Sequence, residues 1–226
     1  MSRFLAVAVA AAVAGAALLA PVPAARAGGR APIHTYRDQE SFNLTGLGKY
    51  AGWYDRLNGP EQVVLSPHLA FSETFAQAYF SSSDKPVHGT WSFLILSGRT
   101  YYKGIGASTW KISKLSAAQT RHWQQQLNPY NSAAKFDAIR GVTRVGPGHY
   151  QVTATPAQAG AFLEYEYYLF ASDLTDTGIK SVTVSLWLDS TGRPARFTVT
   201  ARSSEENVNI SETFTHYNQP MTIKAP

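Results

Sequence analysis

The stretch SLWLDSTGRPARFTVTA, residues Ser185–Ala201, has the clearest hairpin pattern in the chain, with two strands joined by a tight turn. Apolar and polar residues alternate on both sides of the link Asp189–Gly192, which is typical of strands with one buried face. In the link, Asp189 can hydrogen-bond the turn backbone, and Gly192 can take the positive φ that such turns need. The pattern predicts an antiparallel hairpin with an apolar face and a polar face.

Further strands are expected around this hairpin, and helices are expected in the middle of the chain. The segment 68–80 fits either a strand or a helix, and a strand is favoured because a clear strand follows it. Strands are predicted at 68–80, 91–96, 99–103, 110–112, 142–145, 149–154, 207–217 and 221–224. Helices are predicted at 116–127, where Ser116 and Gln119 form a capping box, and at 132–140 and 155–171. The sequence therefore predicts one α+β domain dominated by an antiparallel sheet.

The first 27 residues have the pattern of a secretory signal peptide. Arg3 precedes an uncharged apolar run from Phe4 to Ala20, and an A-x-A cleavage pattern ends at Ala27. The run is short against the roughly 20 residues that span a bilayer, so cleavage after about Ala27 is favoured over a membrane anchor. Residues 28–65 are expected to be a partly irregular lead-in with a short helix at 50–57, and residues 66–226 are expected to form the folded domain.

The composition excludes several classes of function. The chain has no cysteine, so disulfides, thiolate metal sites and a lipid-carrying cysteine are all excluded. The net charge is +5, but the charges are scattered without a run of Lys or Arg, so nucleic acid is not expected as a partner. A mild attraction to anionic surfaces remains compatible with this charge.

No motif for catalysis or metal binding is found. The six histidines include no pair at i, i+4 spacing and no H-E-x-x-H, and no G-x-S-x-G elbow occurs. We therefore expect no catalytic residue, no metal site and no cofactor, and the protein is not expected to be an enzyme. A hydrolase with an unrecognised site is the remote alternative.

Aromatic residues are abundant, with five Trp, twelve Tyr and eleven Phe, and they gather at 71–102 and 162–170. Core packing is the simplest explanation, because aromatic side chains dominate ordinary cores. The alternative is a curved sheet with an aromatic-rich cavity that helices cover without filling, as in pockets for apolar ligands.

Four stretches, taken in order, resemble actinobacterial lipoproteins of the LppX/LprG type. They are GRTYYKGIGASTWKIS (98–113), FDAIRGVTRVGPGHYQVTATP (136–156), VSLWLDSTGRPARFTVTA (184–201) and ETFTHYNQPMTIKAP (212–226). The similarity covers about 71–226. It implies a curved antiparallel half-barrel with helices on its concave face, related to LolA-type carriers. It also implies non-covalent handling of acylated lipids or lipoproteins in the cell envelope, without catalytic residues.

Under this resemblance, the apolar face of the sheet lines a ligand cavity. The expected partner is a lipid or acylated ligand, with a membrane surface or an envelope protein as a further candidate. The chain departs from the family in lacking the lipid-anchoring cysteine and in its first 65 residues. The alternative function is a non-enzymatic interaction module with a filled core that binds a protein or cell-wall partner. The candidate cavity residues are Phe93, Ile95, Phe162, Leu186, Phe197 and Val199.

Overall fold

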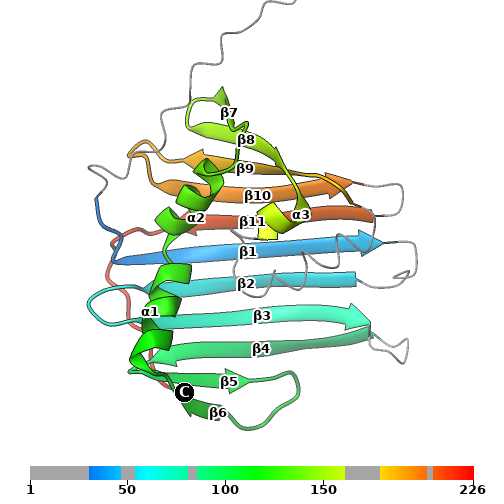
Figure 1. Ribbon diagram of the computed structural model, residues 1–226. Coiled ribbons are helices and arrows are strands. Elements are labelled where there is room, and N and C mark those ends of the chain that lie inside the picture. The colour runs from blue at the N-terminus through cyan, green and yellow to red at the C-terminus, as the bar shows by residue number, and fades with distance from the viewer. Residues whose placement is uncertain (1–30, 47–53, 81–85, 161–178, 203–205) are drawn as a thin grey trace, which may run out of the picture.

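One antiparallel sheet dominates the computed structural model, which describes residues 31–46, 54–80, 86–160, 179–202 and 206–226 (Figure 1). Its eleven strands follow the order β6-β5-β4-β3-β2-β1-β11-β10-β9-β8-β7, and every pair of neighbours is antiparallel. The order does not return to its first strand, so the sheet is an open half-barrel. The predicted α+β half-barrel is confirmed.

In the described part of the chain, strands are the first and last elements in sequence order, and the helices lie between them. The strands are β1 Thr35–Gly46, β2 Tyr54–Val64, β3 Ala70–Phe80, β4 Pro86–Leu96, β5 Arg99–Lys103, β6 Lys111–Lys114, β7 Thr143–Gly146, β8 His149–Ala154, β9 Val182–Leu188, β10 Pro194–Arg202 and β11 Glu206–Thr215. The helices are α1 Ala117–Gln126, α2 Pro129–Asp137 and α3 Pro156–Gly160.

All three helices lie on one face of the sheet (Figure 1). Helices α1 and α2 connect β6 to β7, the two edge strands, and therefore cross the sheet from one edge toward the other. Helix α3 connects β8 to β9 on the same side. We call the face under the helices the inner face and the opposite one the outer face.

The turn that the opening stretch predicts is present between β9 and β10. Asp189 Oδ1 accepts hydrogen bonds from the backbone N–H groups of Thr191 at 2.8 Å and Arg193 at 3.0 Å. The Arg193 Nε donates to Asp189 Oδ2 at 2.9 Å, which closes an ion pair across the turn. Gly192 has φ +81°, a conformation that a side chain would disfavour. Local side-chain chemistry therefore fixes this hairpin.

Local signals also place the helix starts. The predicted capping box of α1 is confirmed: Gln119 N donates to Ser116 Oγ at 3.2 Å, and Ser116 N donates to the Gln119 side chain at 2.8 Å. Helix α2 begins at Pro129, three residues before the predicted start, because Asn128 caps it and Pro suits the first helical position. The predicted extension of the third helix beyond Gly160 falls outside the described residues.

The irregular N-terminal segment expected from the sequence is wrong for residues 35–46 and 54–64. Strand β1 pairs with β2 on one side and with β11 on the other, so it occupies the middle of the sheet. The predicted helix at 50–57 overlaps β2 from Tyr54 onward. Strand β1 depends on β11, a partner far along the chain, which a local pattern does not reveal. The strand predicted at 221–224 is also wrong, because pairing ends at a turn where His216 and Asn218 have positive φ.

Strand register places the core on the inner face. In an antiparallel sheet, residues that lie directly opposite one another share a face. Tyr36, Val63, Phe71 and Ile95 form one such row across β1 to β4. All four side chains are buried, with at most 1% of their surface exposed. The apolar side of each strand therefore faces the helices.

Candidate apolar binding face

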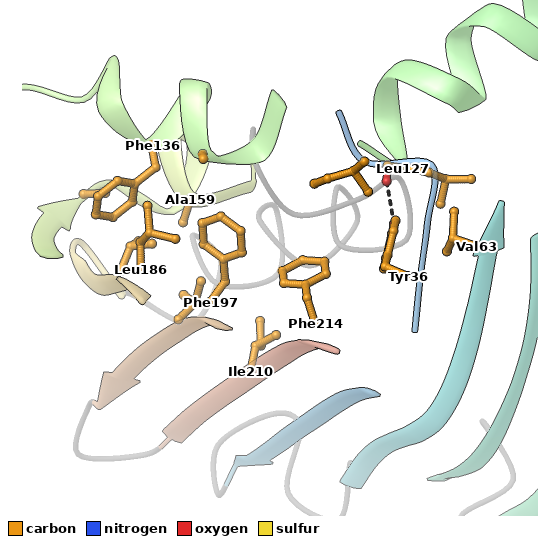
Figure 2. Close-up of a cluster of buried hydrophobic side chains, with 14 of the residues drawn as sticks. Tyr36, Val63, Leu127, Phe136, Ala159, Leu186, Phe197, Ile210 and Phe214 are labelled. Carbon is orange, nitrogen blue, oxygen red and sulfur yellow. Dashed lines mark hydrogen bonds between the residues drawn. The ribbon is translucent and has the colours of Figure 1, made fainter. Parts of the chain in front are cut away.

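The inner face over β8 to β11 is closely packed by α2 and α3. Helix α2 buries Ser132, Ala133 and Phe136 against the sheet, and α3 buries Ala159. Figure 2 shows Phe136 and Ala159 on the helix side and Leu186, Phe197 and Phe214 on the strand side of this cluster. The rings of Phe197 and Phe214 meet edge to face at 5.8 Å between centroids. This half of the inner face is filled by the protein's own side chains.

Most of the candidate cavity residues belong to one buried cluster. Phe93 packs against this cluster and is partly buried, and Phe162 lies outside the described residues. Each of the five described candidates occupies an inner-face register position, but contact with a ligand stays a prediction for all of them. The buried ones are Ile95, Leu186, Phe197 and Val199, with at most 4% of their surface exposed.

The opposite half of the inner face carries a more open group of rings, which we call the aromatic cluster. Phe93 lies 5.5 Å from Trp123 of α1 and 6.1 Å from Phe71, and Trp91 lies 6.2 Å from Tyr102, all between ring centroids. Phe71 is buried, Trp91, Phe93 and Trp123 are partly buried, and Tyr102 is 42% exposed. The abundance of aromatic residues at 71–102 predicted an aromatic-rich region, but Phe71, Trp91, Tyr102 and Trp123 were not among the candidate cavity residues.

Helix α1 covers the aromatic cluster only loosely. None of its residues is fully buried, whereas α2 buries four. It is held by the contacts of Trp123 with the sheet, by a hydrogen bond of 3.1 Å from the Gln124 side chain to the Leu65 carbonyl, and by the link to α2. At that link, the Tyr36 hydroxyl donates to the Leu127 carbonyl (Figure 2). Helix α1 is therefore fixed in place at its junction with α2, and it packs only lightly on the rings of the aromatic cluster.

Between the two apolar halves, the inner face carries a row of buried carboxylates. Asp38, Glu61 and Glu73 lie opposite one another across β1, β2 and β3, and Glu212 lies nearby on β11. All four are at most 8% exposed, and none lacks an interaction partner. The sequence pattern did not predict strands β1 and β2, so these carboxylates were not among the candidate residues. With the strands known, their alternation with Arg37 and Gln62 would have placed them on the same face as Tyr36 and Val63.

These carboxylates affect Tyr217, which lies against Tyr36. Burial raises the pKa of the Tyr217 hydroxyl far above its ordinary value, and the charges of Asp38 and Glu212 raise it further. The hydroxyl is therefore neutral and donates to the Pro194 carbonyl. The centre of the inner face is thus polar and is flanked by apolar surface.

Among the described residues, no group of three or more His, Asp or Glu side chains is arranged to hold a metal ion. In the same part of the chain, no helix combines the length and the apolar character needed to cross a membrane.

Comparison with known proteins gives similarity in shape alone. No protein-family model matches the sequence, and no curated protein matches it. The crystal structure of LprF from Mycobacterium bovis superposes with a TM-score of 0.46 at 12% identity, covering 86% of this chain and 90% of that one. The crystal structure of the lipoprotein LppX from Mycobacterium tuberculosis gives a TM-score of 0.40 at 14% identity, covering 85% and 90% of the two chains. These identities and TM-scores support no functional conclusion, so a function has to be inferred from the side chains of this protein.

Proposed function

We propose that the protein binds the acyl chains of lipids non-covalently at the aromatic cluster, without catalysis, and acts outside the cytoplasm after removal of residues 1–27. The observation that supports this proposal is the partly open cluster formed by Trp91, Phe93 and Tyr102 of the sheet with Trp123 of the lightly packed α1. A large apolar surface that is covered but not filled is the usual setting for an apolar ligand.

The energetics are adequate for such a ligand. Burial of a methylene group gains about 0.8 kcal/mol, so an acyl chain that buries roughly fifteen of them gains about 12 kcal/mol, of which about 8 kcal/mol is left after an association cost of about 4 kcal/mol. That net value corresponds to binding in the micromolar range. A site of this strength would suit a carrier, which has to release its ligand.

Titration with a long-chain fluorescent fatty acid tests the proposal. Phe93→Ala removes a ring from the inner face, and Tyr101→Ala is the matched control because Tyr101 lies beside it on β5 with its register position on the outer face. We expect Phe93→Ala to weaken binding on the order of tenfold, from lost apolar contact, and Tyr101→Ala to leave it unchanged. Equal affinity in both variants, or no uptake by the unmodified protein, would contradict the proposal.

The filled half of the inner face supports a second candidate function. Phe136 and Ala159 occupy the space over Leu186 and Phe197, as expected for an interaction module that uses the fold without an internal ligand. Native mass spectrometry of the protein purified from its own host separates the two functions. Co-purifying lipid supports the carrier, whereas a protein that carries no lipid and takes up no probe supports the interaction module.

A further inference from the structure

The hairpin β5–β6 forms one edge of the sheet and is strongly basic. Arg99, Lys103, Lys111 and Lys114 lie on it, and residues 85–136 contain no Asp or Glu. Three of these cations are exposed and Lys103 is half-buried. In the described part of the chain, none of the four forms an ion pair with a carboxylate. The ion pair that the structure shows there joins Asp189 to Arg193. The hairpin is therefore an uncompensated patch of positive charge.

The placement of these charges is unfavourable for the isolated fold. Arg99 lies directly opposite Lys114, and like charges at opposite positions destabilise a strand pair. Lysine on an edge strand does discourage pairing between molecules, but a carboxylate opposite Arg99 would serve that purpose without the repulsion. An anion from outside the protein, bound beside Arg99 and Lys114, would offset the repulsion between them.

The same hairpin exposes apolar side chains. Ile112 is 56% exposed and Tyr102 is 42% exposed, and they are two of the three large hydrophobic side chains that are most exposed in the described residues. The third, Val145, lies on β7 at the other edge. Cations beside exposed apolar and aromatic groups match the boundary between lipid headgroups and acyl chains, whereas a soluble polyanion would use only the charges.

We propose that the β5–β6 hairpin docks the protein on the surface of a bilayer that contains anionic phospholipid. The cations contact the headgroups, and the edge of the sheet enters the boundary with the acyl chains, with Ile112 on its outer face and Tyr102 on its inner face. Tyr102 also belongs to the aromatic cluster, through its contact with Trp91. Docking on this edge therefore brings the open side of the cluster to the membrane, where a chain can be exchanged. This last step rests on the proposed function, but the docking does not.

Sedimentation with vesicles of phosphatidylcholine and phosphatidylglycerol tests the docking. We compare Lys111→Gln/Lys114→Gln with Arg37→Gln/Arg202→Gln, which removes two exposed cations from β1 and β10 instead. Each cation at a membrane surface contributes about a fivefold change in binding, so the hairpin variant should bind roughly 25-fold more weakly. Vesicle binding of the control variant should change far less. Any effect of the N-terminal residues on binding is common to all variants. Ile112→Ser should weaken binding severalfold at unchanged charge.

A second variant excludes misfolding as the cause. Lys114→Glu places a carboxylate opposite Arg99, so the melting temperature should be maintained or raised while vesicle binding falls. Equal losses in the two double variants would overturn the proposal, because only net charge would then matter. Binding to soluble polyphosphate that matches vesicle binding and ignores Ile112→Ser would also overturn it, in favour of a soluble polyanion. Vesicle binding without uptake of the fatty-acid probe would retain the docking and refute the proposed function.

Discussion

Replacement of Phe197 by Trp distinguishes a packed core from a ligand cavity at the centre of the hairpin Ser185–Ala201. Phe197 is 4% exposed, meets Phe214 edge to face, and lies directly opposite Leu186, which is 1% exposed. The larger indole has to displace these neighbours, and overpacking of this kind typically costs about 1–3 kcal/mol. In a domain of this size, 1 kcal/mol shifts the melting temperature by about 2–4 °C, so we expect a fall of roughly 2–12 °C.

The assay combines thermal unfolding with uptake of the fluorescent fatty acid, expressed per folded molecule. Phe197→Trp should lower the melting temperature and leave uptake unchanged. Phe93→Trp is the matched control in the aromatic cluster, where partial exposure of Phe93 leaves room for the larger ring. It should alter uptake with little effect on stability. An unchanged melting temperature together with lost uptake in Phe197→Trp would contradict a packed core and place empty space beside Phe197.

Two further predictions concern the turn and the N-terminus. Burial alone would raise the pKa of Asp189, but hydrogen bonds from Thr191 and Arg193 outweigh it and hold the pKa below its ordinary value. The ionised carboxylate therefore stabilises the fold at pH 7, and this contribution is lost as the pH falls through the lowered pKa. Asp189→Asn should lower the melting temperature at pH 7, and the difference from the unmodified protein should shrink below about pH 4; a constant difference across pH would contradict this account. Intact mass of the protein released by its host should correspond to a chain that begins at about Gly28, and retention of Met1 would instead indicate an anchored protein.

Where neighbouring residues decide the structure, the sequence predicted it well. The Asp189 turn and the Ser116 capping box each depend on side chains within four residues of the backbone groups that they bind, and both are present. The apolar alternation of β9 and β10 likewise predicted their buried faces correctly, from Val184 to Val199. Local turn and cap chemistry, together with the alternation of apolar and polar residues, were sufficient to predict these elements.

The central strands were missed because their inner faces are not uniformly apolar. In β1, the inward residue after Tyr36 is Asp38, and in β2 the inward residue before Val63 is Glu61. A carboxylate at such a position reads as a solvated loop, although it is buried once the neighbouring strands and their partners are in place. The aromatic cluster could not be predicted from the sequence for a similar reason. Trp123 lies on a helix and Phe93 lies on a strand, and no local pattern shows that the two rings are in contact.

The pairing of β1 with β11 governs the order in which the protein can assemble. Arg37 lies opposite Thr215, so the middle of the sheet joins the first and last strands that the structure describes. Until residues 206–215 have emerged, β1 and β10 each remain an unpaired edge bordered by apolar side chains, which invites association with other chains. Contacts of such long sequence separation slow folding, since the chain has to close a large loop before they form. The sheet therefore reaches its native topology only after the whole chain is available, whatever compartment it folds in.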